Sequence, residues 1–374
     1  MKKVLFLTGT RADFGKVKPL IQILEQEPGF EVFLFVTGMH MQYEYGLTLL
    51  EIERCNFSNI NTFQNQTKET TMDLSLAKTI EGLSQYATQV HPDLIVVHGD
   101  RIETLAGAIV GSLNNILVAH IEGGEISGTI DELLRHSVSK LSHIHFVANQ
   151  EAGNRLIQMG EIEESIFEIG SPDIDVMASE KLPDIQTVKD YYEIEFGEYA
   201  ILLFHPVTTE IEELQNQLDV LMDTLQESDK NFVVIYPNND LGSSKIISQY
   251  NRILKPDHRF RIIPSLRFEY FLSLLKNCEF IIGNSSAGVR EAPFYNIPAI
   301  NLGSRQNNRS KNSEIINIDY NKEKILNAIS SARKKKEVDA SIEFGKGNSA
   351  ELFLEALKSE KIWNLNHQKQ FKEI

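Results

Sequence analysis

The sequence has few cysteines and no long apolar run. Cys55 and Cys278 stand far apart among 374 residues, and their spacing matches no zinc or redox motif. We expect both to be reduced, buried core residues without a chemical role, in a cytoplasmic protein. No apolar run approaches the roughly 18 residues that a membrane span needs, so no membrane association is expected. The apolar run behind the basic N-terminus is short and leads into Gly-Thr-Arg-Ala-Asp, which favours a core strand over a signal peptide.

A positive net charge is also missing. The 37 Lys and Arg residues are outnumbered by 52 Asp and Glu residues, and the formal net charge is −15. Such a chain is a poor partner for nucleic acid or for an anionic membrane surface, so neither is expected. A small anionic ligand is still compatible with this charge, because a local cluster of basic side chains and backbone N–H groups is enough to bind it.

Apolar strand-like runs and amphipathic helix-like segments alternate through both halves of the chain. Hydrophobic residues make up 42% of the sequence and charged residues 24%, as in ordinary globular proteins. The alternation is typical of parallel sheets that are covered on both faces. Because the length favours two domains, we predict an α/β protein with two Rossmann-like, doubly wound domains facing a cleft.

The regular alternation is interrupted in the segment GSPDIDVMASEKLPDIQ, residues 170–186, which carries two prolines. We predict an N-terminal domain over 1–172, a C-terminal domain over 186–350, and a helical tail over 351–374. The sequence leaves open which domain the tail packs against. In such folds, ligands bind outside the carboxyl ends of the strands, so the loops that directly follow strands are the candidate sites.

The first of these loops, GTRADFGK, resembles a phosphate-binding loop but is not one. Walker A needs four residues between its glycines and a Ser or Thr after the Lys, whereas five residues separate Gly9 from Gly15 and Val17 follows Lys16. The dinucleotide fingerprint G-x-G-x-x-G follows none of the predicted strands either. Arg11 and Lys16 remain able to reach an anion; the alternative is that both are simply solvated.

The loop IIGNSSAGVREAP is the best candidate for binding a nucleotide diphosphate. A predicted strand ends at Gly283, and Asn284, Ser285 and Ser286 are placed to cap the next helix, whose N-terminal N–H groups suit a diphosphate without a metal. Glu291 would lie about a turn and a half along that helix and accept both ribose hydroxyls. The alternative is an ordinary Ser cap with a surface Glu. Arg305, after the next strand, is a second candidate phosphate contact.

Three acids follow strands or begin a helix in the N-terminal half. Asp100 ends the strand LIVVHGD, Glu122 ends the neighbouring ILVAHIE, and Asp131 opens the helix DELLRHSVSK. If the sheet edge brings them together, they repel, and at least one is expected to stay protonated, as acid–base chemistry requires. The alternative is a helix cap and two loop acids. His205 follows a strand and precedes a proline, which favours a site role, and no H-E-x-x-H or similar group predicts a catalytic metal.

Several of these strings together resemble one known family. TGTRADFGK, HGDR, HIEGGEISGTIDELLRHS, GSPDIDVM, FHPVTTE, YPNND and IGNSSAGVREAP are similar to the hydrolysing UDP-N-acetylglucosamine 2-epimerases of bacterial sialic acid synthesis, over roughly residues 2–310. Non-hydrolysing epimerases typically read Thr-Arg-Pro-Glu, Glu-Ala-Gly and Asp-Ser-Gly-Gly at three places. Here those places read Thr10-Arg11-Ala12-Asp13, Glu122-Gly123-Gly124 and Asn284-Ser285-Ser286-Ala287, which favours the hydrolysing branch.

The resemblance implies a glycosyltransferase-B type fold, a homodimer or tetramer, no cofactor and a UDP-sugar substrate. It implies elimination of UDP from UDP-N-acetylglucosamine, then hydration of the 2-acetamidoglucal to N-acetylmannosamine. Two alternatives stay open: the same reaction on UDP-2,4-diacetamido-2,4,6-trideoxyglucose, or a glycosyltransferase on this fold. By motif match, the catalytic residues are Asp100, Glu122 and Asp131, with His205 at the phosphates. The residues implied to hold UDP are Arg11, Lys16, Arg101, Asn238, Ser285, Ser286, Glu291 and Arg305.

Overall fold

The computed structural model describes residues 1–66, 71–127, 130–306, 315–332 and 344–373. The chain forms two compact units. Unit 1 comprises Met1–Glu125, Asp131–Ser179 and Glu343–Ile374, and unit 2 comprises Ile126–Ile130 and Glu180–Ile342. Apart from the short segment Ile126–Ile130, the chain leaves unit 1 after Ser179, seven residues beyond the predicted end of the N-terminal domain, and its C-terminal segment returns to unit 1.

Unit 1 contains a parallel sheet of seven strands in the order β3-β2-β1-β4-β5-β6-β7. All of its strand pairs are parallel. The sequence predicted every strand except the short β3. The strands are β1 (Lys2–Thr8), β2 (Phe30–Val36), β3 (Ile60–Thr62), β4 (Leu94–His98), β5 (Leu117–Ile121), β6 (Ile144–Val147) and β7 (Ile166–Glu168).

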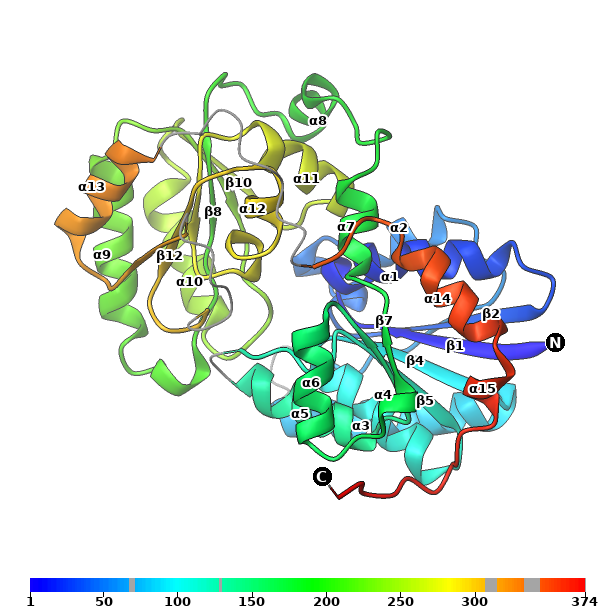
Figure 1. Ribbon diagram of the computed structural model, residues 1–374. Coiled ribbons are helices and arrows are strands. Elements are labelled where there is room, and N and C mark those ends of the chain that lie inside the picture. Colours follow the sequence, from blue (N-terminus) through cyan, green and yellow to red (C-terminus); the bar gives the residue numbers. More distant parts are fainter. Residues whose placement is uncertain (67–70, 128–129, 307–314, 333–343, 374) are drawn as a thin grey trace. The chain divides into compact units, whose positions relative to one another are not determined.

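Helices cover both faces of this sheet (Figure 1). The alternation along β1 explains why: Val4 and Phe6 join the core under α1 and α14, while Leu5 and Leu7 join the core under α3 and α4. The helices of unit 1 are α1 (Arg11–Glu25), α2 (Leu49–Glu53), α3 (Met72–Val90), α4 (Ile102–Leu113), α5 (Ile130–Leu141), α6 (Gln150–Gln158), α7 (Pro172–Met177), α14 (Ser349–Lys358) and α15 (Glu360–Trp363).

Unit 2 repeats the architecture with a six-stranded parallel sheet in the order β10-β9-β8-β11-β12-β13. In both units the strand order reverses beside the first strand, as in a doubly wound fold, so the predicted fold class is confirmed. The strands are β8 (Ala200–Leu203), β9 (Phe232–Ile235), β10 (Phe260–Ile263), β11 (Ile281–Gly283), β12 (Ala299–Leu302) and β13 (Ile315–Ile318).

The helices of unit 2 also lie on both faces of their sheet (Figure 1). Side chains of α9, α10 and α13 fill the core on one face, and α11 packs with α8 and α12 on the other. The helices are α8 (Ile185–Tyr192), α9 (Leu214–Glu227), α10 (Ser243–Gln249), α11 (Phe268–Asn277), α12 (Glu291–Phe294) and α13 (Lys322–Ser331). Among the described residues, no helix has the length and apolarity needed to cross a membrane.

Candidate functional site

Glu122 follows β5 directly and adopts an unusual backbone conformation. Its φ is +63°, a left-handed value that non-glycine residues rarely adopt. Its backbone N–H donates to Phe146 O at 3.0 Å, which extends the pairing with β6 by one residue. The side chain is 4% exposed. A strained backbone that aims a buried carboxylate is typical of functional sites.

Three elements surround the Glu122 carboxylate. Ser171, the residue before α7, donates its hydroxyl to Oε1. His98, at the end of β4, places Nε2 3.4 Å from Oε2. Lys16, from α1, places Nζ 3.9 Å from Oε1. The carboxylate therefore faces a hydroxyl, an imidazole and an ammonium group, all at the carboxyl edge of the sheet.

Lys16 has a closer partner than Glu122. Its Nζ lies 3.0 Å from Oδ2 of Asp173, which is fully buried in α7. Lys16 lies in the second turn of α1 and not, as the sequence suggested, in its first turn, and the structure directs its charge toward two acids of the same unit. Its contact with UDP stays a prediction.

Arg135 joins two of the three predicted acids. This arginine of α5 is 1% exposed; its Nη1 donates to Glu122 O at 2.7 Å, and its Nη2 pairs with Oδ2 of Asp100. Asp131 lies in the first turn of the same helix, four residues before Arg135 and thus on the same helical face. The sequence did not single out Arg135, because the bond to Asp100 links residues 35 positions apart.

The two glycines after Glu122 are required by close packing. A Cβ on Gly124, which has φ +75°, would lie 2.2 Å from Ala152 O, and a Cβ on Gly123 would lie 2.9 Å from Nδ1 of His120. His120 itself bonds Ser139 Oγ and Gly99 O at 3.0 and 2.8 Å. Its burial lowers the pKa of the imidazole to about 3, so His120 is neutral and connects the turn after β4 with helix α5.

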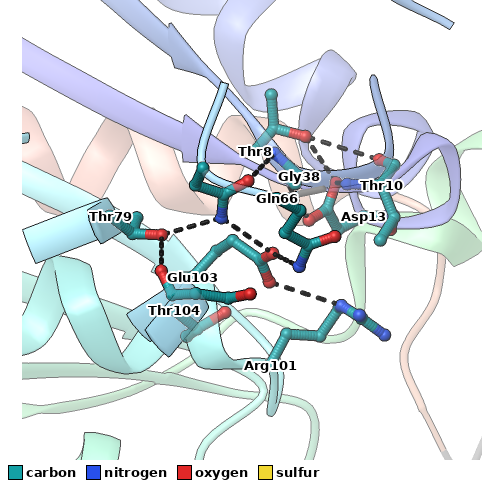
Figure 2. Close-up of polar contacts among 12 residues, drawn as sticks. Thr8, Thr10, Asp13, Gly38, Gln66, Thr79, Arg101, Glu103 and Thr104 are labelled. Atoms are coloured by element: carbon teal, nitrogen blue, oxygen red, sulfur yellow. Dashed lines mark hydrogen bonds and ion pairs between the residues drawn. The ribbon is translucent and has the colours of Figure 1, made fainter. Parts of the chain in front are cut away.

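The predicted arginines of unit 1 also pair with acids. Arg11 Nη2 lies 2.6 Å from Oε1 of Glu51. Figure 2 shows Arg101 directed toward the buried carboxylate of Glu103, with Nε 3.5 Å from Oε2, and the Gln66 amide donating to Oε1 at 3.1 Å. The same view shows Asp13 folding back beneath the loop before α1, where it forms a capping box with Thr10.

In unit 2 the strand β11 ends at Gly283, as predicted, but the following helix is not continuous. Ser285 accepts a hydrogen bond from Ala287 N and caps a single 3₁₀ turn, Ser286–Gly288. α12 begins only at Glu291 and has four residues. The expectation that Glu291 lies a turn and a half along one helix is therefore wrong. The Ala-Gly pair ends the turn, and the chain starts a second, separate helix.

Asn284 organises the loop after β11, a role that the sequence did not indicate. Its side chain donates to His205 O at 2.8 Å and accepts from His205 N at 2.7 Å. Its carbonyl accepts from Arg305 Nη1 at 3.2 Å and from Gln306 Nε2 at 3.1 Å. One residue thus connects the ends of β8, β11 and β12.

The tautomer of His205 follows from its neighbours. The backbone N–H of Asn238, after β9, donates to Nδ1 of His205 at 3.0 Å. Because Nδ1 accepts, the neutral ring carries its proton on Nε2 and can donate there. In the structure, the backbone N–H of Asn238 orients His205. The predicted contact of Asn238 with UDP stays a prediction. Glu291 and the adjacent Arg290 are both buried.

The sequence did not single out Ser171, Asp173 or Arg135, and it indicated Asn284 only as a candidate helix cap. A signal was present for the first two, because GSPDIDVM directly follows the strand β7, and the rule about carboxyl ends of strands applies to it as well. Within the described part of the chain, no group of three or more His, Cys, Asp or Glu residues could hold a metal ion.

The chain has a fold of the glycosyltransferase-B type, with two parallel-sheet α/β units whose polar residues gather at the carboxyl ends of the strands. A family profile described as UDP-N-acetylglucosamine 2-epimerase matches residues 22–358. The protein belongs to the UDP-N-acetylglucosamine 2-epimerase family.

Individual relatives agree with this assignment. The chain is 47% identical to a UDP-N-acetylglucosamine 2-epimerase of Neisseria meningitidis serogroup B, with 99% of each chain covered. It is 33% identical to a hydrolyzing UDP-N,N'-diacetylbacillosamine 2-epimerase of Legionella pneumophila, with 96% of each covered. Its fold matches that of the Methanocaldococcus jannaschii UDP-GlcNAc 2-epimerase in complex with UDP-GlcNAc and UDP. That match has a TM-score of 0.81 and 25% identity, and covers 96% of this chain and 99% of the other.

Proposed function

We propose that the protein is a hydrolysing epimerase that converts UDP-N-acetylglucosamine to N-acetylmannosamine and UDP. The observation that carries the proposal is the acid group of unit 1, in which Glu122 is aimed by a left-handed backbone and tied to Asp100 through Arg135. A glycosyltransferase needs a single base and an acceptor. Arg135 joins the carboxylate of Asp100 to the backbone of Glu122, and Asp131 lies on the helix of Arg135. Three acids in one unit fit two successive proton transfers better.

In this proposal unit 2 binds UDP. The hydroxyls of Ser285 and Ser286, the guanidinium of Arg305 and the Nε2–H of His205 are suitable donors for a diphosphate, and Glu291 is a suitable acceptor for ribose hydroxyls. Arg305 and His205 are both fixed by Asn284, so these donors are organised before the ligand arrives. Arg11, Lys16, Arg101 and Asn238 complete the proposed UDP contacts.

The chemistry follows from the substrate. The C2 hydrogen of the sugar has no neighbouring carbonyl in the ring and is not acidic. We infer that the C1–O bond to UDP breaks early, that the bonding pair leaves with UDP, and that positive charge develops at C1. A carboxylate then takes the C2 proton and the C1–C2 double bond forms. Water next attacks C1 and gives one of its protons to a carboxylate, while a protonated acid delivers a proton to C2 from the opposite face.

A second candidate substrate is a UDP-2,4-diacetamido-2,4,6-trideoxy sugar. It is favoured by the name of the Legionella relative, but that relative is less similar than the Neisseria epimerase, at 33% against 47% identity. We therefore propose the N-acetylglucosamine substrate, with the product feeding sialic acid synthesis in the cytoplasm, for instance for a capsule. A homodimer or homotetramer is proposed as the working assembly.

One NMR experiment tests the proposal. The protein is incubated with UDP-N-acetylglucosamine in D₂O without any acceptor. We expect free UDP and N-acetylmannosamine that carries deuterium at C2, because the proton returned to C2 comes from solvent. Retention of the original C2 proton, or turnover only when an acceptor sugar is added, would contradict the proposal. Parallel incubation with the 2,4-diacetamido substrate separates the two candidate sugars.

A further inference from the structure

Asp173 is a buried charge that the proposed reaction does not use. Its side chain is fully buried at the start of α7, two residues after Ser171, which donates to Glu122. Burying a carboxylate is costly unless a partner offsets the loss of water. The partner is Lys16 of α1, with Nζ 3.0 Å from Oδ2 of Asp173.

The same ammonium group also faces Glu122. Its Nζ lies 3.9 Å from Oε1 of Glu122, and the Lys16 and Glu122 side chains are only 10% and 4% exposed. Charges so close and so far from water interact strongly, because little solvent screens them. The proton affinity of the Glu122 carboxylate therefore depends on how strongly the Lys16 ammonium group interacts with each of the two acids.

We propose that Asp173 is a positioning residue that sets the basicity of Glu122 through Lys16. By binding the ammonium group, Asp173 holds it at the edge of the Glu122 carboxylate. The negative charge of Asp173 also offsets part of the electrostatic effect of Lys16 on Glu122. Glu122 then keeps the proton affinity that a base needs. This inference rests on the proposed function, in which Glu122 exchanges a proton with the sugar.

The charged and titratable groups around Glu122 set the sign of the expected effects. They are Lys16 from α1, His98 and Asp100 at the end of β4, Glu125 in its own turn, Arg135 from α5, and Asp173 from α7. Removing the negative charge of Asp173 strengthens the net effect of the Lys16 charge on Glu122, so Glu122 becomes easier to ionise. Removing the positive charge of Lys16 has the opposite effect.

The test compares Asp173→Asn with the control Asp175→Asn. Asp175 lies on the same helix, but its carboxylate accepts from Ser349 N and Ala350 N at 2.9 and 2.8 Å and so caps α14. We expect Asp173→Asn to move the titration midpoint of Glu122 down by about one pH unit. Asp175→Asn should lower the melting temperature and leave the midpoint where it is. Lys16→Met should raise the midpoint, and the double variant Lys16→Met/Asp173→Asn should fall between the two single variants.

The midpoint is measured by NMR on ¹³C-glutamate-labelled protein without substrate, with the Glu122 signal assigned from Glu122→Gln. In the pH profile of kcat/KM, the midpoint of the acid limb should shift in the same direction as the NMR midpoint. An unchanged midpoint in Asp173→Asn, or an equal shift in Asp175→Asn, overturns the inference. If Asp173→Asn does not fold, Asp173→Ser, which keeps an acceptor for Lys16, is measured with the same expectation. Because the NMR titration needs no turnover, its result is independent of whether the proposed reaction occurs.

Discussion

At the scale of single residues, Asn284 shows how one side chain organises several others. It holds His205 by two hydrogen bonds to its backbone and, through its own carbonyl, accepts from Arg305 and Gln306. The preceding residue must be glycine, because Gly283 has φ +139° and a Cβ there would lie 2.0 Å from Leu203 O. The end of β11 therefore lies against the end of β8, which brings Asn284 within reach of His205.

We predict that Asn284→Ala reduces kcat/KM for the UDP-sugar by at least about tenfold, because the backbone of His205 loses both side-chain hydrogen bonds that fix it. Arg305 keeps its acceptor, which is the main-chain carbonyl of residue 284. The buried His205 N–H would also lose its acceptor, which costs about 1–3 kcal/mol of unfolding free energy. Steady-state kinetics and urea unfolding measure the two effects. The matched control is Asn231→Ala, whose exposed amide bonds Glu198 O beside the start of β9. A fully active Asn284→Ala variant would remove Asn284 from the site.

At the scale of elements, a buried charge cluster fastens the C-terminal segment to unit 1. Glu161, after α6, lies 2.8 Å from Lys140 Nζ of α5 and 3.1 Å from His145 Nε2 of β6, and it also pairs with Lys369. Lys369 in turn donates to two carbonyls at the end of α5, those of Ser139 and Ser142. The cluster therefore joins α5, β6 and the C-terminal segment.

This cluster predicts a stability change in acid. Burial alone would raise the pKa of Glu161, but the His145 hydrogen bond and the lysine charges outweigh it and lower the pKa to about 2. A depressed carboxyl pKa stabilises the folded state above the ordinary value of 4.5, and this contribution is lost as the pH falls toward 2. We expect the stability difference between wild type and Glu161→Gln to shrink by about 3 kcal/mol across that range.

Urea unfolding at a series of pH values measures this difference. Glu164→Gln, at an exposed position three residues later, is the control, and its free energy of unfolding should equal that of wild type at every pH. A difference between wild type and Glu161→Gln that stays constant from pH 4.5 to pH 2 would mean that Glu161 keeps its proton affinity on folding.

At the scale of the whole molecule, the chain closes unit 1 with its last helices after it has completed unit 2. Phe353 of α14 is fully buried and packs on Phe6 of β1 and Phe146 of β6, with ring centroids 6.3 and 4.8 Å apart. Asp175 caps the same helix. Unit 1 is thus built from both ends of the sequence.

We predict that Phe353→Ala lowers the stability of unit 1 by about 3–5 kcal/mol and leaves unit 2 unchanged, because the cavity opens in the core of one unit only. Hydrogen exchange followed by mass spectrometry resolves the two units: exchange should rise in β1 and β4–β6 and stay constant in β8–β12. Phe371→Ala, at a position that is 68% exposed in the same C-terminal segment, should alter neither unit. Faster exchange in both units would show that they unfold together.

Much of this organisation was predictable from local pattern. The apolar runs from β1 to β12 identified the strands, except for the short β3, and the chain order of strands and helices gave the doubly wound class. The prediction failed where pattern is weak. β3 has three residues, and β13 is only partly buried. The helix predicted after β11 is interrupted. A single 3₁₀ turn ends at Gly288, and α12 begins only at Glu291.

The sequence by itself determined the elements and the loops that carry polar residues, because hydrophobic periodicity and turn residues act over a few neighbouring positions. Only the tertiary structure decided which polar groups meet. Lys16 pairs with Asp173, Arg135 joins Asp100 to the backbone of Glu122, and the C-terminal helix returns to unit 1. These contacts join residues far apart in the chain, and their geometry depends on strand order and register, which no local pattern encodes.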